Sequence, residues 1–164
     1  MAELSESEDP PSRLTTSVPL RWGDMDAYGH VNNVDILRIL EEARVRVLGS
    51  PAHTGRPVGE PLVPVFNDLP KGTQALVAEH RVRYVAVLDY RDVPAIVDVW
   101  VSQIGGAGLT LAYEIRDGHD GSRCVVAETR LAFFDEPSGR LMRLDAAHRR
   151  RLDPYYGPSP FARR

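Results

Sequence analysis

A single long amphipathic helix is the feature that most constrains how this chain can fold. The run from Asn33 to Leu48 has the periodicity of a helix with one wide apolar face. Asn32 or Asn33 can cap its first turn, and Gly49 followed by Pro51 can end it. On a helical wheel the apolar face contains Ile36, Leu37, Leu40, Ala43, Val47 and Leu48, and the opposite face contains Asp35, Arg38, Glu42 and Arg46. An apolar face of this width has to be covered by a partner of comparable size.

Only a β-sheet formed by the rest of the chain is large enough to cover this helix. Four later runs alternate apolar and polar residues as half-buried strands do, over residues 74–88, 95–104, 107–117 and 122–134. An earlier run over 15–22 predicts a first strand, and tight turns such as Gly105-Gly106 join the later ones. The Pro- and Gly-rich residues 49–73 predict a long loop with a short strand at 62–66. The predicted fold is therefore α+β, an antiparallel sheet wrapped around one long helix.

The composition indicates one globular domain with a slightly acidic balance. The 164 residues predict a mobile N-terminal tail over 1–14, a domain over 15–153 and a C-terminal tail over 154–164. The formal net charge of -3 argues against nucleic acid as the main partner. Cys124 is the single cysteine, which excludes an internal disulfide and fits a reducing compartment. Without an apolar leader or a membrane-spanning run, the expected location is the cytoplasm.

Potential chemistry is concentrated in the polar segment just before the helix. The segment carries Asp24 and Asp26, then His30, Asn32 and Asn33. The first N–H groups of a helix are unpaired and carry partial positive charge, so they can stabilise an oxyanion beside a carboxylate. A simpler alternative is that such an aspartate only forms a turn or a cap. A divalent metal site built from Asp24, Asp26 and His30 is another alternative, but no second histidine or cysteine cluster supports it.

A family resemblance rests on three motifs at fixed spacing, Arg21-Trp22-Gly23-Asp24-Met25-Asp26, Gly29-His30-Val31-Asn32-Asn33 and Glu41-Glu42-Ala43-Arg44. With the element order, they resemble the hotdog fold, in particular the 4-hydroxybenzoyl-CoA thioesterase-like acyl-CoA thioesterases. The resemblance implies that Asp26 is the catalytic carboxylate, as nucleophile or general base, and that the Asn33 backbone N–H polarises the thioester oxygen. It also implies a site at a dimer interface. Many relatives carry an aromatic residue where this chain has Ile36, which leaves the acyl preference open.

The remaining site residues follow from the same resemblance. His30 is a catalytic candidate that can equally fix the loop, and Val31 and Asn32 are expected to contact substrate beside the helix N-terminus. Arg83 is the candidate for binding the CoA phosphates, although Arg81, Arg91 and Arg123 carry the same charge. No metal and no separate cofactor are expected, because coenzyme A enters as part of the substrate.

The leading hypothesis is an acyl-CoA thioesterase that releases a carboxylic acid and free CoA. It is expected to work as a homodimer or homotetramer, with no membrane or nucleic-acid partner. The alternatives are a non-catalytic acyl-CoA sensor of the same fold, a hotdog-type hydratase, and a thioesterase acting on acyl carrier protein.

Some residues outside the motifs interrupt the patterns of the helix and strands. Arg44 lies in the apolar face of the helix, where a half-buried ion pair with Glu41 is expected. His80 lies on the apolar side of its strand and is expected to be a hydrogen-bonded core histidine. Trp100 and Cys124 lie on the outward series of their strands and are candidates for a subunit contact.

Overall fold

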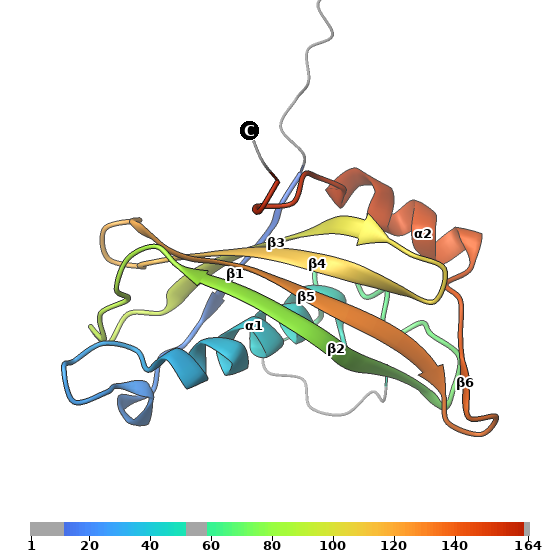
Figure 1. Cartoon of the computed structure of the whole chain (residues 1–164), viewed down its shortest axis with the longest axis horizontal. Coiled ribbons are helices and arrows are strands. Elements are labelled where there is room, and N and C mark those ends of the chain that lie inside the picture. The colour runs from blue at the N-terminus through green and yellow to red at the C-terminus, as the bar shows by residue number, and fades with distance from the viewer. Residues whose placement is uncertain (1–11, 52–58, 163–164) are drawn as a thin grey trace, which may run out of the picture.

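The computed structural model describes residues 12–51 and 59–162, which form one sheet around one long helix (Figure 1). The elements, in chain order, are β1 (Leu14–Val18), η1 (Trp22–Asp24), α1 (Asn33–Leu48), β2 (Thr73–Tyr84), β3 (Ala95–Ile104), β4 (Gly108–Arg116), β5 (Arg123–Asp135), β6 (Arg140–Leu141), α2 (Ala146–Leu152) and η2 (Asp153–Tyr155). This arrangement confirms the predicted α+β class. Within the described residues, no helix is both long enough and apolar enough to cross a membrane.

The strands pair antiparallel in the order β1-β3-β4-β5-β2, and β6 pairs with the end of β5. Consecutive strands β3, β4 and β5 are therefore neighbours, as their short turns require. β2 comes earlier in the chain but lies beyond β5, so it forms an edge of the sheet (Figure 1). In Figure 1, α1 lies under the concave face of the sheet, whereas α2 and the C-terminal segment lie on the opposite side.

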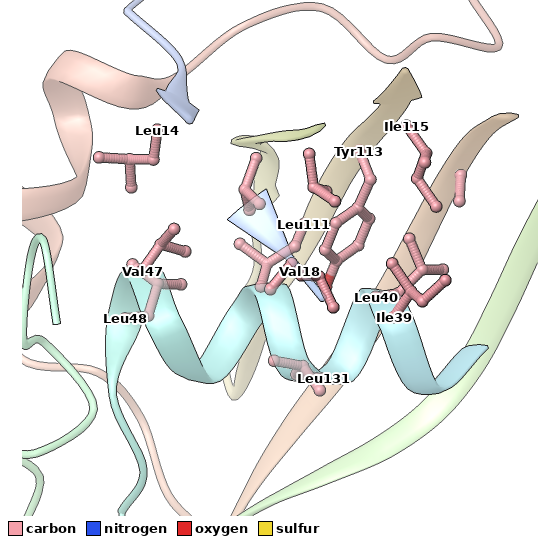
Figure 2. Packing of buried hydrophobic residues seen from close by; sticks show 14 of the residues in the cluster. Leu14, Val18, Ile39, Leu40, Val47, Leu48, Leu111, Tyr113, Ile115 and Leu131 are labelled. Carbon is pink, nitrogen blue, oxygen red and sulfur yellow. The ribbon is translucent and has the colours of Figure 1, made fainter. Parts of the chain in front are cut away.

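The core lies between α1 and the concave face of the sheet (Figure 2). Helix residues Ile39, Leu40, Val47 and Leu48 meet strand residues such as Leu111 in a contiguous apolar cluster. All five are almost fully buried. Burying a side chain of this size stabilises the fold by about 1.5 to 3 kcal/mol before conformational entropy is counted.

The buried face of α1 is rotated from the predicted one. Leu37, predicted on the apolar face, is 37% exposed, whereas Ile39, which was not assigned to that face, is fully buried. The helix packs chiefly on β1 and β3 and makes little contact with β2.

Both ends of α1 are closed as the sequence predicts. The Asn32 side chain caps the first turn by accepting a hydrogen bond from the Val34 N–H at 3.2 Å. The C-cap is Gly49 with φ of 84°, a left-handed conformation that suits glycine. On the polar face, Glu42 receives hydrogen bonds from Arg38 at 2.7 Å and from Arg46 at 2.8 Å. The predicted i, i+4 pairing is therefore confirmed.

Three strand predictions are wrong. The strand predicted over 74–88 ends at Tyr84, and proline explains the other two. No strand forms at 62–66; instead, the Val63 and Phe66 N–H groups bond to carbonyls of Val47 and Leu48 at the end of α1. Pro61 and Pro64 lack the N–H groups that a strand needs there. The first strand spans Leu14–Val18 rather than 15–22, because Pro19 follows directly.

Arg44 and His80, the two polar residues predicted on apolar faces, each have a polar partner. Arg44 is 6% exposed and contacts Glu41 at 3.3 Å, which confirms the expected ion pair. The His80 Nδ1 lies 2.9 Å from the Thr129 hydroxyl, so this histidine is hydrogen-bonded as expected. Burial, and then the charge of Arg44, lower the pKa of His80 below its usual value. A neutral ring with an unprotonated Nδ1 can accept a hydrogen bond from the Thr129 hydroxyl. Tyr113 points from β4 toward α1 in the same region (Figure 2), and burial raises its pKa.

Part of the outward side of the sheet, around Trp100, is covered by the chain's own C-terminal segment, residues 156–162. The Trp100 indole N–H donates to the Pro158 carbonyl at 2.9 Å, and Gly157 N–H bonds to the Val101 carbonyl. Trp100 is consequently 3% exposed, and Cys124 is fully buried in the core. The expectation that Trp100 and Cys124 serve a subunit contact is therefore wrong.

Candidate functional site

The Asp26 carboxylate is held by the backbone of its own loop. Its Oδ1 accepts hydrogen bonds from the N–H groups of Tyr28 at 2.7 Å and His30 at 3.1 Å. The Asp26 N–H in turn donates to the His30 carbonyl at 2.7 Å, and Gly29 supplies the positive φ of 81° that closes this turn. Among the described residues, no group bonds Oδ2. One oxygen of the carboxylate is thus anchored, and the other can act on a bound molecule.

Helix α1 begins beside this loop. Its first residue is Asn33, whose N–H has no acceptor within the helix, as is general for the first turn. The preceding residue is tied down, because the Asn32 N–H donates to the Asp24 carbonyl at 2.7 Å. The Tyr84 hydroxyl donates to the Asn33 carbonyl at 3.3 Å and so links the end of β2 to the helix start.

These two groups open onto one pocket of about 400 Å³. The lining residues are Asp26, His30, Val31, Asn33, Ile36, Tyr84, Val85, Ala86, Val87, Leu88 and Val125. Four of the six predicted site residues are therefore brought together. The pocket is apolar along the strand side and polar at the Asp26 side. This is the usual composition of a site that binds an apolar group and reacts at one polar point.

The other two predicted site residues lie outside the pocket lining. Asn32 is next to the pocket, but its side chain caps the helix. Arg83 extends from the outward side of β2, where its guanidinium lies 5.0 Å from the ring centroid of Phe161. Arg81 stacks on the same ring at 4.1 Å. The structure therefore does not bring Arg83 to the Asp26 pocket.

Asp24 has surroundings quite unlike those of Asp26. It is fully buried, and its carboxylate accepts hydrogen bonds from the Arg21 N–H at 2.7 Å, the Arg21 guanidinium at 2.9 Å and the Arg38 guanidinium at 2.5 Å. Burial alone would raise the pKa of Asp24, but these hydrogen bonds and the two positive charges outweigh it and lower the pKa. With its oxygens bound in this way, Asp24 does not join Asp26 and His30 in the metal site that was considered. No other metal-binding group is found in the described part of the chain.

A second segment completes the site, although the sequence pattern placed its first residues, 85–88, in a strand and gave them no role in the site. Residues 85–91, just after β2, run along the Asp26 loop, with the Val31 N–H bonded to the Leu88 carbonyl at 2.8 Å and the Tyr90 N–H bonded to the Gly29 carbonyl at 3.0 Å. His30 and Asp89 form an isolated antiparallel bridge. The only sequence signal for this segment was the loss of strict alternation at Val85, Val87 and Leu88.

Comparison with known proteins identifies the family. The profile of the thioesterase-like superfamily matches residues 20–152. No curated protein matches the chain.

Several solved structures share the fold. A predicted thioesterase from Bacillus stearothermophilus is 20% identical, covers 90% of this chain and 98% of its own, and has a TM-score of 0.70. A 1,4-dihydroxy-2-naphthoyl-CoA thioesterase from Synechocystis is 15% identical over 87% of this chain and 96% of its own, with a TM-score of 0.67. A thioesterase from Thermus thermophilus, complexed with coenzyme A and Zn, is 22% identical over 84% of this chain and 95% of its own, with a TM-score of 0.61. The predicted hotdog thioesterase resemblance is confirmed.

Proposed function

The chain belongs to the thioesterase-like superfamily and is a thioester hydrolase, and on this basis we propose that it hydrolyses acyl-CoA to a carboxylic acid and free CoA. The observation that carries the proposal is the pairing of two groups in one pocket. Asp26 and the first residue of α1, Asn33, both line it. A carboxylate and an unpaired helix N–H can therefore act on the same thioester carbonyl.

In this proposal, Asp26 activates water or attacks the carbonyl itself. The anchored Oδ1 fixes the carboxylate, and Oδ2 faces the reaction. The Asn33 N–H stabilises the oxyanion that forms when the carbonyl carbon becomes tetrahedral. No cofactor takes part, and CoA enters only as part of the substrate. The single cysteine, Cys124, is buried, and burial raises its pKa, so it supplies no competing nucleophile.

The apolar wall of the pocket favours a substrate with an apolar acyl group. Ile36 and Val125 are buried against the core, and Val85 and Val87 are exposed on the segment just after β2. The proposed location is the cytoplasm, because a reduced thiol is the state expected there.

We further propose that the working form is a homodimer joined along β2. This strand is an edge of the sheet, and among the described residues no strand pairs with the outer side of its backbone. Large apolar side chains along it and just after it are unusually exposed, namely Leu76 47%, Val77 43%, Tyr84 53%, Val85 52% and Val87 59%. A second copy would cover these side chains and also close the pocket, because residues 84–87 belong to both.

The test is thiol release from a panel of acyl-CoA and acyl carrier protein thioesters, with wild type beside Asp26→Asn. We expect the variant to lose turnover by at least about 10²-fold, the lower range for a general base, while it still binds a non-hydrolysable acyl-CoA. Loss of turnover with binding preserved assigns the chemistry to Asp26.

Asp35→Asn is the matched control. It makes the same chemical change on the first turn of α1, but Asp35 does not line the pocket. Asp26→Asn turnover equal to wild type would overturn the catalytic assignment. If wild type binds acyl-CoA saturably but does not hydrolyse it, the proposed function changes from a thioesterase to a non-catalytic acyl-CoA sensor. Turnover of carrier-protein thioesters alone would change the proposed substrate.

A further inference from the structure

His30 faces a carboxylate that lies outside the pocket lining. The His30 Nε2 is 3.8 Å from the Asp89 Oδ1, and each side chain is about one-third exposed. The antiparallel bridge between these two residues places their side chains on the same side of the paired backbone. The bonds from Val31 to Leu88 and from Tyr90 to Gly29 flank the bridge, so the two side chains stay together.

Asp89 is itself held by Arg91. The Arg91 Nη2 donates to the Asp89 Oδ2 at 2.6 Å, and the Arg91 Nη1 donates to Asp117 at 3.3 Å. Asp120 lies 3.9 Å from the same guanidinium on its far side. The next residue, Asp92, has φ of 49°, which turns the chain sharply away after this group. Arg91 thus fixes the Asp89 carboxylate with one oxygen toward His30.

His30 is also tied to the catalytic carboxylate. Its backbone N–H donates to the Asp26 Oδ1, and its side chain lines the pocket. In the described part of the chain, no group bonds the Nδ1 of its ring. With Nε2 facing Asp89, Nδ1 is the ring nitrogen that can form a hydrogen bond or exchange a proton with a molecule in the pocket.

We propose that Asp89 is a positioning residue that holds His30 as the acid for the departing thiol. The inference rests on the proposed function. When water adds to the thioester carbon, Asp26 takes one of its protons. The C–S bond then breaks, sulfur keeps both bonding electrons, and His30 supplies the proton that forms the free thiol. Asp26 returns its proton to His30, so one water is consumed and one acid and one thiol are released.

The chemistry favours this direction of transfer. An imidazolium is a stronger acid than an alkyl thiol, so it can protonate the thiolate as it leaves. The carboxylate of Asp89 can orient the ring, as the third group of a catalytic triad does. The present separation is longer than a hydrogen bond, and catalytic contacts of this kind shorten when substrate binds.

The test compares Asp89→Asn with wild type on two thioesters of the same acyl group. One is the CoA ester, and the other is the S-(4-nitrophenyl) ester, whose thiolate leaves without needing a proton. We expect kcat for the CoA ester to fall about 10- to 100-fold with KM nearly unchanged, and kcat for the nitrophenyl ester to fall less than about threefold. Asp89→Glu, which keeps the carboxylate, restores part of the loss.

Asp120→Asn is the matched control, because it removes a carboxylate near Arg91 that does not approach His30. An equal loss of kcat on both esters, or none on the CoA ester, overturns the proposal. If Asp89→Asn does not fold, Arg91→Gln, which frees the Asp89 side chain, should give the same difference between the two esters. An equal effect of Arg91→Gln on both esters overturns the proposal.

Asp26→Asn is measured in parallel. Normal turnover by that variant means that the proposed function fails, whereas an inactive Asp26→Asn beside a normal Asp89→Asn means that only this inference fails.

Discussion

Asp24 and Asp26 carry the same carboxylate two positions apart, but their partners differ. The Asp24 oxygens accept hydrogen bonds from two guanidinium groups and one backbone N–H. Within the described residues, Asp26 accepts hydrogen bonds only from two backbone N–H groups, both on Oδ1. A carboxylate between two cations is a structural group, because its charge is already paired. Asp26 keeps an oxygen without a partner among the described residues, which is what the proposed catalytic role requires.

The ion pairs of Asp24 should be visible in stability. We expect Asp24→Asn to reduce the free energy of unfolding at pH 7 by about 2 to 3 kcal/mol, since Arg38 loses a buried partner. The pKa of Asp24 is lowered in the folded protein, so its contribution is complete above the ordinary value of 3.8 and is lost as the pH falls through the folded value. Urea unfolding of both proteins across pH 3 to 7 measures this difference.

Asp35→Asn is the control for this measurement as well. Asp35 contacts the same arginines at 3.7 and 3.9 Å but is partly exposed, so its removal should change stability by less than about 1 kcal/mol. A difference between wild type and Asp24→Asn that stays constant down to pH 3 would contradict the assigned ion pairs.

Within α1, Glu41 and Arg44 form an unequal pair. Arg44 is buried, and its Nη1 has no hydrogen-bond partner in the part of the chain that the structure describes, whereas the Glu41 side chain is 67% exposed. Removing the arginine leaves a glutamate that water can solvate, but neutralising the glutamate leaves a buried cation unpaired.

We therefore expect Arg44→Met to change the free energy of unfolding by less than about 1 kcal/mol and Glu41→Gln to lower it by about 1 to 2 kcal/mol. Urea unfolding of the two variants at pH 7 compares them directly. The prediction fails if Arg44→Met is the more destabilised variant, because the arginine would then be contributing more than its pairing with Glu41.

The elements that could be predicted are those fixed by local patterns. The periodicity of α1, its caps and the alternation of β3, β4 and β5 are encoded by residues close in the chain. The site loop was also predictable, because Asp26, His30 and Asn33 lie within one short segment. The buried side of α1 could not be predicted in full, because Leu37 and Ile39 are both apolar and only the position of the sheet distinguishes them.

The parts that could not be predicted depend on contacts between distant segments. The pairing of Val31 with Leu88 brings Asp89 to His30, and neither segment indicates the other. The position of Arg83 likewise depends on Phe161, near the end of the chain. Charge alone made Arg83 a candidate for binding phosphate, but the face of the strand determines where that charge lies.

At the scale of the whole molecule, the edge strand β2 leads to a prediction about assembly. Lysine on an edge strand opposes pairing with another edge, because it would place charge in the interface. We expect wild type to be a dimer by light scattering at micromolar concentration and Val77→Lys to shift it toward monomer. Val77 is distant from the pocket end of β2, so the substitution does not touch the site directly.

Leu141→Lys is the matched control, since Leu141 is 65% exposed on β6 and away from β2. It should leave the mass unchanged. A monomeric wild type, or an equal effect of the two lysines, would count against the β2 interface.

The two ends of the described chain meet on a single side chain. The Arg13 guanidinium lies 4.2 Å from the Trp100 ring centroid, and the Pro158 carbonyl accepts from the same indole. A short linker could therefore join them, and the polypeptide could be reopened at the exposed turn Glu136–Gly139, at the opposite end of β5 from the pocket residue Val125. A circular permutant of the described residues would keep every strand pairing while placing its new ends at the Glu136–Gly139 turn, and it would carry the Asp26 loop and α1 inside the chain rather than near one end.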